Sequence, residues 1–389
     1  MELSKRERVI RTIEVGGNST PDKLPIFSWG FERTAGAWKH FLKSQEFKNL
    51  YNDFLGKISW ETEKRRKFTA LKMAEGRFLN LDVHPIDNFK KLTKPKIIPA
   101  PPEYPGLYLG LTQGRLLKRD DAGHYWYVDG YFTSRERVDE IWGKYGKPHE
   151  RLYDEEYSPQ KWEQYVENMK DCFFPIGTIP LTFSEAIIEG VTPAKLGYYM
   201  RKKPDFVHYL QKEYMKTAKE IINRLSDAGV EVCFFGDDLG QKMRTLLSPK
   251  NFKEFVLPYY KGVYQHVRKK GMLLIQHSCG FIDPFVPLMA DAGLHCIQSL
   301  QKTAGVDLAN LVEKVGDKIA FMGALDDSRT LKFGTNKEIE EDVKNCIKIA
   351  GQNGNYGPGL SNSILNPPWN NLLAMREYLE KYRDYPLNF

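Results

Sequence analysis

The chain has few cysteines, no long apolar run and no large excess of charge of either sign. No stretch of 18 or more apolar residues occurs in its 389 residues, so neither a transmembrane helix nor a membrane partner is expected. The first residues, MELSKRERVIRTIE, contain no apolar signal core. An odd number of cysteines builds no disulfide framework, so reduced thiols and a cytoplasmic location are predicted. The five cysteines are scattered, at Cys172, Cys233, Cys279, Cys296 and Cys346.

The charge balance and the apolar content narrow the class of protein further. A net charge of +7, with Lys and Glu interleaved, gives a mild preference for anionic ligands but no nucleic-acid tract. Hydrophobic residues make up 41% of the chain and aromatic residues 13%, which is enough for a large core. We therefore expect a folded protein that acts on a small molecule, with no nucleic acid as a partner.

Short apolar segments alternate with amphipathic ones throughout the second half of the chain. The apolar segments EVCFFGDD, MLLIQ, HCIQSL and IAFMGAL predict strands. Helical spacing of apolar residues predicts helices over 201–229, 248–271, 283–293, 307–318, 335–354 and 367–382. This alternation is typical of βαβ units with a parallel sheet. Because no glycine-rich dinucleotide fingerprint follows any strand, the pattern favours a (β/α)8 TIM barrel over a doubly wound fold.

The first half of the chain is less regular and predicts additions to the barrel. The apolar run IGTIPLTF (176–183) is interpreted as an earlier barrel strand. The proline-rich segment 94–106 predicts a connector, and 114–132 predicts a β-hairpin that turns at 121–123, with HYWYV as its second strand. We predict one barrel domain over 1–389, with an N-terminal extension and an insertion near 90–170.

In a parallel barrel, the catalytic groups gather at the C-terminal ends of the strands. We therefore expect the polar residues that follow the predicted strands to converge on one mouth. These residues are Asp237, Asp238, His277, Cys279, Gln298, Gln301, Asp326 and Asp327.

The motif HSCG places an imidazole and a thiol on one short turn after a buried strand. A His-x-Cys pair can supply two zinc ligands, and catalytic zinc commonly takes three protein ligands and keeps one position open. By position, Asp237 or Asp238 is a better third ligand than any other cysteine. The alternative is that His277 is a histidine of the barrel rim and Cys279 a packing residue. Either aspartate could instead cap a turn, or the pair could provide a proton donor near neutral pH.

Glu185 follows the predicted strand 176–183 in LTFSEAIIEG. Its carboxylate could point into the barrel mouth and bind substrate, or it could be an acidic residue of a first helical turn.

Several segments together resemble the uroporphyrinogen decarboxylase superfamily. They are FFGDDLG, SPKNFKEFVLPYYKGVYQHVRKKG, LLIQHSCGF, the stretch from LMADAG to FGTNKEI, and PPWNNLLAM, in the family's order and spacing. The resemblance implies a (β/α)8 barrel. One branch of the family decarboxylates uroporphyrinogen without a cofactor and carries two arginines in its opening motif. At that place PIFSWGFERTAG offers only Arg33. In a decarboxylase of this kind, Arg33 and Arg244 would bind substrate carboxylates. Asp237 or Asp238 would stabilise a protonated intermediate.

The second branch comprises cobamide-dependent methyltransferases, which hold zinc through a His-x-Cys pair and a distant cysteine. HSCG matches the first two ligands at His277 and Cys279, whereas the loop GPGLSNSILNPP contains Ser361 and Asn362 and no cysteine. A carboxylate in place of the distant thiolate would leave zinc more Lewis-acidic and would suit a methyl ether or hydroxyl oxygen.

The resemblance therefore predicts an enzyme, a methyltransferase that uses zinc. It would move a methyl group between a small substrate, either methoxylated or a thiol, and a corrinoid carried by a partner protein. Besides Glu185 and Arg33, we assign Gln298 and Asn362 to substrate binding. The alternatives are a cofactor-free decarboxylase of an anionic substrate and a barrel that binds a tetrapyrrole without turnover. A homodimer is one possible assembly of the chain.

Overall fold

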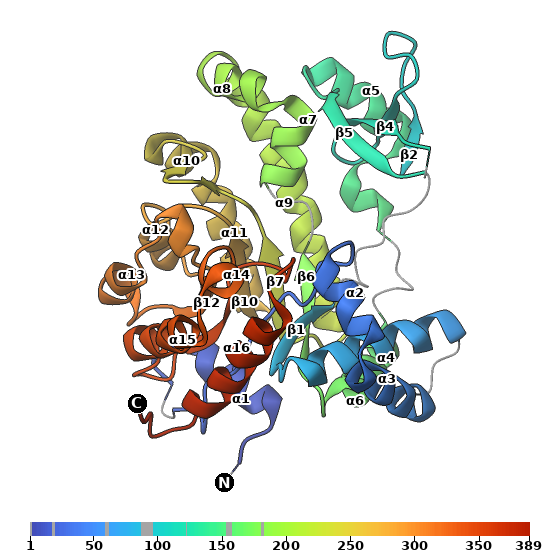
Figure 1. Ribbon diagram of the computed structural model, residues 1–389. Coiled ribbons are helices and arrows are strands. Elements are labelled where there is room, and N and C mark those ends of the chain that lie inside the picture. Colours follow the sequence, from blue (N-terminus) through green and yellow to red (C-terminus); the bar gives the residue numbers. More distant parts are fainter. Residues whose placement is uncertain are drawn as a thin grey trace.

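A parallel sheet of seven strands forms most of a barrel in the computed structural model (Figure 1). The structure describes residues 2–17, 20–58, 62–86, 96–121, 123–152, 158–179 and 183–389, without the side chains of residues 86 and 184–186. Neighbouring strands of the sheet follow each other along the chain, as in successive βαβ units. In spatial order the strands are β1 (Val83–Ile86), β6 (Phe174–Ile179), β7 (Val232–Gly236), β10 (Leu273–Ser278), β11 (Cys296–Ser299), β12 (Ala320–Leu325) and β13 (Tyr356–Leu360).

The segment around Phe27 closes the barrel between the first and last strands of this sheet. Phe27 forms parallel bridges with Val83 of β1 and with Gly359 of β13. The backbones approach so closely that a Cβ atom on Gly359 would lie 1.9 Å from the carbonyl oxygen of Phe27. Only glycine fits there. The TIM-barrel prediction is therefore confirmed.

Alternate strand residues fill the barrel interior, and helix α1 (Lys5–Ile13) covers its N-terminal end. Val9 and Ile13 of α1 join the interior cluster. On β6, β7 and β12 the inward residues are two apart, as the pleat requires. The interior residues from the strands and the closing segment are Phe27, Val83, Phe174, Ile176, Val232, Phe234, Ile275, Cys296, Ala320 and Met322.

Helices surround the sheet and bury the outward side chains of the strands in a second, larger core. The α-helices after α1 are α2 (Gly36–Lys43), α3 (Gln45–Lys57), α4 (Glu63–Phe78), α5 (Arg135–Tyr145), α6 (Pro159–Met169), α7 (Glu189–Val191), α8 (Pro193–Lys202), α9 (Pro204–Asp227), α10 (Pro249–Phe255), α11 (Leu257–Lys269), α12 (Val286–Asp291), α13 (Leu308–Val315), α14 (Thr330–Phe333), α15 (Asn336–Ala350) and α16 (Trp369–Tyr382). Short 3-10 helices occupy Pro148–Arg151 and Lys302–Ala304, and a π-helix occupies Phe183–Ile188.

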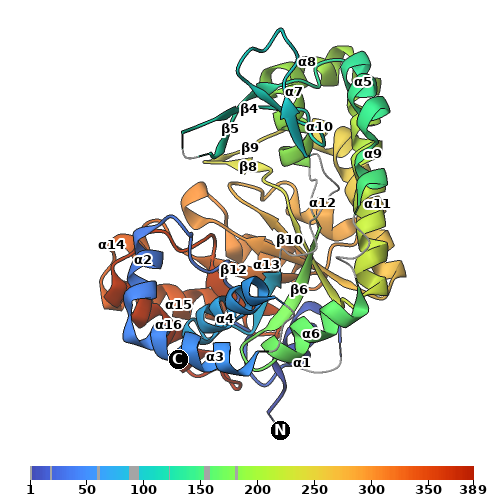
Figure 2. The same cartoon turned by 90° about the vertical axis from the view of Figure 1, so that its right-hand side faces the viewer.

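The insertion forms a four-stranded antiparallel sheet, which is larger than the predicted hairpin. The hairpin itself is confirmed by β4 (Arg115–Arg119) and β5 (Tyr125–Gly130). Two further strands, β2 (Ile97–Pro99) and β3 (Tyr108–Gly110), extend it, so part of the predicted connector is a strand. Figure 2 shows this sheet at the end of the molecule opposite the N-terminus, with the small hairpin of β8 (Gly240–Gln241) and β9 (Arg244–Thr245) between it and the barrel.

Two local predictions need correction. The segment 248–271 is not one helix, because α10 ends before Val256 and α11 begins with Leu257 and Pro258. Proline has no N–H to donate to a preceding turn, so the helix is interrupted there. The segment GPGL, interpreted as a loop, is part of strand β13.

None of the helices in the described parts of the chain combines the length and the apolar character needed to cross a membrane.

Candidate functional site

The ends of β7 and β10 bring an imidazole, a thiol and a carboxylate together at the C-terminal end of the barrel. His277 is the penultimate residue of β10 and points inward, because it lies two residues after the interior residue Ile275. Cys279 follows the strand directly. Asp238 is the second residue after β7, the neighbouring strand, so its loop lies beside the turn that carries Cys279.

The loops after β7 and β10 are held in contact by backbone hydrogen bonds and by two glycines. The N–H of Gly240 donates to the carbonyl of Cys279 at 3.1 Å. A Cβ atom on Gly280 would lie 2.3 Å from the carbonyl carbon of Gly240, so this approach requires glycine. The glycine of HSCG is therefore needed to set the thiol against Asp238.

The three side chains place their donor atoms around one point. His277 Nε2 lies 3.1 Å from Cys279 Sγ and 3.3 Å from Asp238 Oδ1. All three donor atoms lie within 4.8 Å of one another. The backbone N–H of Cys279 also donates to Asp238 Oδ1 at 2.9 Å. His277 is buried, whereas the Asp238 side chain is 58% exposed, so the group is open on the side of Asp238.

The electrostatics of this group favour a positive charge at its centre. Burial acts against the charged imidazolium, but hydrogen bonds to Asp238 and Cys279 and their negative charges raise the pKa of His277 to about 10. Burial also disfavours the charged form of Asp238 and would raise its pKa. The hydrogen bond and charge of His277, together with the N–H of Cys279, instead lower the pKa of Asp238 to about 2. A metal cation that replaced the proton on Nε2 would gain the same interactions.

Aromatic and amide side chains enclose the imidazole of His277. The ring of Trp29 stands perpendicular to it, with the centroids 5.0 Å apart, and Trp29 also packs edge-on against Phe234. On the other side, His277 Nδ1 lies 2.5 Å from Gln298 Oε1. Trp29 was not selected from the sequence, although SWG follows an apolar run in PIFSWGF that could have indicated a strand end.

Asn362 occupies the loop where the family resemblance placed a distant cysteine. Its amide Nδ2 donates to Cys279 Sγ at 3.3 Å, and its Oδ1 accepts the N–H of Ser363 at 2.8 Å. Asn362 therefore contacts the sulfur of the site, and a hydrogen bond of this kind stabilises a thiolate.

The neighbouring acid, Asp237, faces away from the three donor atoms. It is buried, and its Oδ2 accepts hydrogen bonds from the N–H of Phe183 at 2.8 Å and from the hydroxyl of Tyr260 on α11. Burial together with this negative charge raises the pKa of Tyr260 well above its usual range. Asp237 thus lies between the sheet and α11 and connects the end of β7 to the π-helix Phe183–Ile188.

Two predicted substrate-binding residues lie away from these contacts or outside the described side chains. Arg33 donates to Glu75 at 2.7 Å and its guanidinium lies 3.9 Å from the centroid of the Trp38 ring. Glu75 also accepts the N–H of Phe31, so this cluster fixes the chain after the closing segment. The side chain of Glu185 falls outside the described residues.

Asp326 and Asp327 have different roles although they are adjacent. Asp326 accepts the N–H groups of Ser328, Arg329 and Thr330 and therefore caps the turn after β12. Burial, and to a smaller extent the charge of Asp326, raises the pKa of Asp327 to about 6.

Comparisons with known proteins agree with this architecture. A family model described as "Uroporphyrinogen decarboxylase (URO-D)" matches residues 176–382, more than half of the chain. The chain is 25% identical over 225 residues to Uroporphyrinogen decarboxylase 2, chloroplastic, of Oryza sativa subsp. japonica, covering 53% of this chain and 55% of that protein. It is 25% identical over 157 residues to Uroporphyrinogen decarboxylase of Chlorobium limicola, covering 39% and 41%. The chain thus spans about half the length of the curated relatives it matches.

A solved structure matches almost the whole chain. A methyltransferase from Methanosarcina mazei superposes with a TM-score of 0.63 at 15% identity, covering 98% of this chain and 99% of that one. At this level of identity the match establishes the shared fold.

Proposed function

We propose that this chain, which belongs to the uroporphyrinogen decarboxylase family of enzymes, is a methyltransferase built on that family's barrel. It would move a methyl group between a small oxygen- or sulfur-containing substrate and a corrinoid carried by a partner protein. Asp238, His277 and Cys279 would hold a zinc ion. The observation that carries the proposal is the convergence of these three donor atoms at the barrel mouth.

Two of the three spacings between the donor atoms are close to those of tetrahedral zinc, and all three lie within 4.8 Å. Zinc bonds of about 2.0–2.3 Å at tetrahedral angles place neighbouring ligand atoms roughly 3.3–3.6 Å apart. The distances from His277 Nε2 to Cys279 Sγ and to Asp238 Oδ1, 3.1 Å and 3.3 Å, lie close to this range. Nitrogen, sulfur and carboxylate oxygen are all zinc ligands, and three protein ligands leave a fourth position for a substrate.

The bound metal, Asp238 and Asn362 would each assist methyl transfer. When a methyl group leaves an ether or hydroxyl oxygen, the bonding electron pair stays on that oxygen, so a cationic centre nearby lowers the barrier. Zinc would supply that charge as a Lewis acid. Asp238 closes the ligand set on the exposed side, where a substrate can enter, and Asn362 holds the Cys279 sulfur through its amide. A carboxylate in place of a second thiolate favours an oxygen substrate such as a methoxylated compound.

Metal content tests the zinc part of this proposal directly. Purified wild-type protein should contain one zinc per chain, and His277→Ala and Cys279→Ser should lose it. The matched controls are His295→Ala, because His295 is equally buried but precedes β11 at the other end of the barrel, and Cys296→Ser inside the barrel. Equal metal content in wild type and His277→Ala would exclude the site.

Methyl transfer is tested with reduced free cobalamin as the acceptor and a panel of methoxylated compounds and methyl thioethers as donors, and in the reverse direction with methylcobalamin as the donor and thiols as acceptors. Methyl transfer by wild type in either direction, and its loss in the zinc-free variants, would support the proposal. Zinc-loaded protein that transfers a methyl group in neither direction would argue against it.

A decarboxylase remains the second candidate, because the family model and the two relatives described above are uroporphyrinogen decarboxylases. The geometry supports it less. The carboxylate of Asp237 is turned toward Phe183 and Tyr260, and the guanidinium of Arg33 is paired with Glu75. Release of carbon dioxide from uroporphyrinogen by the purified protein would favour this candidate over methyl transfer.

A further inference from the structure

We infer that Gln298 is a positioning residue, which fixes the tautomer and the ring orientation of His277 so that Nε2 faces Asp238 and Cys279. This inference rests on the proposed zinc site and deepens it. It replaces the assignment of Gln298 to substrate binding with a role that acts through His277.

The strand register places the two side chains next to each other. His277 of β10 and Gln298 of β11 are direct partners in the parallel pairing. Both point into the barrel, since each lies two residues after an interior residue, Ile275 and Cys296 respectively. Gln298 is fully buried. Its Oε1 lies 2.5 Å from His277 Nδ1, so a buried amide and a buried imidazole share one hydrogen bond.

A second hydrogen bond decides which end of the Gln298 amide faces His277. The Nε2 of Gln298 donates to the carbonyl oxygen of Ser361 at 3.3 Å. A carbonyl oxygen only accepts, so the NH2 end of the amide must face Ser361 and the oxygen must face His277. That oxygen also only accepts, and Nδ1 must therefore carry the proton. The Nε2 lone pair of a neutral imidazole then points toward Asp238 and Cys279, where a metal ligand needs it.

The anchor of this chain of hydrogen bonds is itself fixed. Ser361 is 1% exposed, and both its N–H and its hydroxyl donate to the carbonyl of Leu325, at 3.3 Å and 3.0 Å. The perpendicular ring of Trp29 limits rotation of the imidazole from the other side. The orientation of His277 is therefore set by the ends of β11, β12 and β13 as well as by its own strand.

The neutral amide also fits the charge of the site. Asp238 and a Cys279 thiolate bring two negative charges, which balance the charge of Zn2+. A carboxylate at position 298 would add a third negative charge where no solvent reaches the side chain. Partners of this kind orient a ligating histidine and commonly change metal affinity by 10- to 100-fold when they are removed.

The first test compares two buried glutamines on the neighbouring strands β10 and β11. Gln298→Met removes the acceptor for Nδ1–H but keeps the side-chain length. Gln276→Met is the matched control, because Gln276 lies on β10 next to His277 but points outward to the hydroxyl of Tyr264. In competition with a chelator, Gln298→Met should bind zinc about 10- to 100-fold more weakly than wild type. Gln276→Met should bind zinc within about twofold of wild type, whatever it does to thermal stability.

Two spectroscopic readouts separate positioning from a general loss of structure. The absorption of cobalt(II) bound in place of zinc should shift in Gln298→Met but not in Gln276→Met. In metal-free protein labelled with 15N-histidine, a slowly exchanging Nδ1–H proton of His277 should be visible in wild type and lost in Gln298→Met.

The outcomes distinguish the inference from the proposed function. Zinc binding and Nδ1–H exchange that are the same in Gln298→Met as in wild type would overturn the inference and leave the zinc site intact. A wild-type protein that binds no zinc yet shows the protected Nδ1–H would overturn the proposed function while retaining the role of Gln298 in orienting His277.

Discussion

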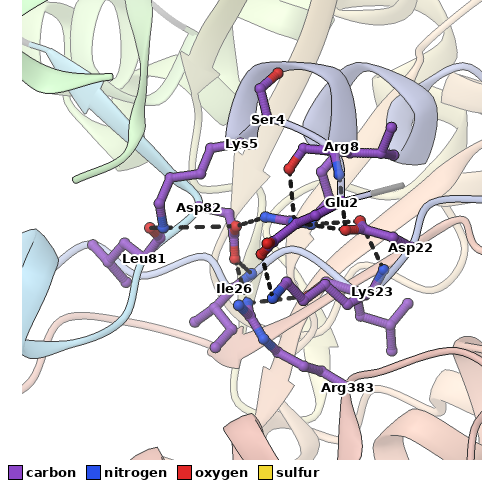
Figure 3. A network of polar contacts seen from close by, with 12 residues as sticks. Glu2, Ser4, Lys5, Arg8, Asp22, Lys23, Ile26, Leu81, Asp82 and Arg383 are labelled. Atoms are coloured by element: carbon purple, nitrogen blue, oxygen red, sulfur yellow. Dashed lines mark hydrogen bonds and ion pairs between the residues drawn. The ribbon is translucent and has the colours of Figure 1, made fainter. Parts of the chain in front are cut away.

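Each end of the barrel holds a carboxylate beside a cationic side chain, but the surrounding chain encloses only the N-terminal carboxylate, so we call that end the closed end and the C-terminal end the open end. At the N-terminal end, Asp82 precedes β1 and is fully buried. Its oxygens accept from Arg8 at 2.6 Å, Arg383 at 2.5 Å and the N–H of Ile26 at 2.9 Å (Figure 3). At the C-terminal end, Asp238 has a 58% exposed side chain.

The partners of Asp82 come from opposite ends of the sequence. Arg8 lies on α1 and Arg383 follows α16, so one buried carboxylate fastens the first and the last parts of the chain to the start of β1. Asp22 completes the network by accepting from the Nε and Nη2 atoms of Arg8, both at 2.9 Å. A buried cluster paired in this way stabilises the fold, whereas the donor atoms of Asp238, His277 and Cys279 converge at a point open to solvent on the side of Asp238. This division agrees with barrels in general, whose chemistry lies at the C-terminal ends of the strands.

The largest expected effect is a loss of stability when the closed end is broken. Asp82→Asn removes the one charged carboxylate that contacts both buried guanidinium groups and leaves Arg8 with Asp22 and Arg383 with the half-exposed Glu380, which should cost about 3 kcal/mol in the free energy of unfolding, the low end for a broken buried pair. Urea unfolding measures this change. Glu231→Gln is the control, because the pair of Glu231 with Arg6 is exposed and should contribute less than about 1 kcal/mol. A similar small loss in both variants would mean that the network is not what joins the chain ends.

The open end should respond to metal instead. Asp238→Asn should change the stability of the metal-free protein by less than about 1 kcal/mol, because the side chain is largely exposed. Zinc at 100 times its Kd should stabilise wild type by about 2.7 kcal/mol, and Asp238→Asn should lose much of this gain at the same zinc concentration. Thermal unfolding with and without zinc measures both quantities. Equal stabilisation of the two proteins would remove Asp238 from the ligand set.

The sequence predicted the part of the fold whose strands are continuous apolar runs. β7, β10, β11 and β12 were predicted in this way, and the position of His277 and Cys279 at the end of a strand followed from them. β13 was missed because Tyr356–Leu360 contains Gly357, Pro358 and Gly359 where an apolar run would be expected. The glycines are there to admit neighbouring backbone and side chains, as at the contact between Gly359 and Phe27. Such a requirement depends on a partner that is distant in sequence.

The choice between Asp237 and Asp238 could not be made from the sequence for a related reason. Strand β7 is apolar on both faces, so VCFF does not reveal which residues point into the barrel. In the structure Phe234 is interior and Phe235 packs against Tyr260, and Asp237 continues the outward face. Gln298 was selected as a strand-end residue, but its contact with His277 depends on the register of β10 and β11, which no local pattern specifies.

Acid should weaken the closed end of the barrel. Burial would raise the pKa of Asp22, but its hydrogen bonds from Arg8 and from the N–H of Leu3 lower it to about 2. Because the folded-state pKa lies below the unfolded value, the stabilisation is complete above about pH 4 and is lost as the pH falls toward 2. Asp22→Asn should therefore cost roughly 1–2 kcal/mol at pH 6 and little at pH 2, measured by urea unfolding across this range. A cost that does not change with pH would contradict the ion-pair role.

The smallest expected change in stability, and the only predicted gain from a substitution, is at Asp327 in the barrel mouth. Burial raises the pKa of Asp327 to about 6, so its ionisation opposes folding. The contribution of Asp327 to the free energy of unfolding is most favourable below its unfolded-state pKa near 4, where the carboxyl group is protonated. This contribution is lost as the pH rises through 6. Asp327→Asn should then stabilise the protein by about 1 kcal/mol at pH 7, less than the pKa difference alone implies, because the amide keeps only one acceptor oxygen. At pH 4 the gain should vanish. A variant that is less stable than wild type at pH 7 would show that the Asp327 carboxylate is held by partners that outweigh its burial.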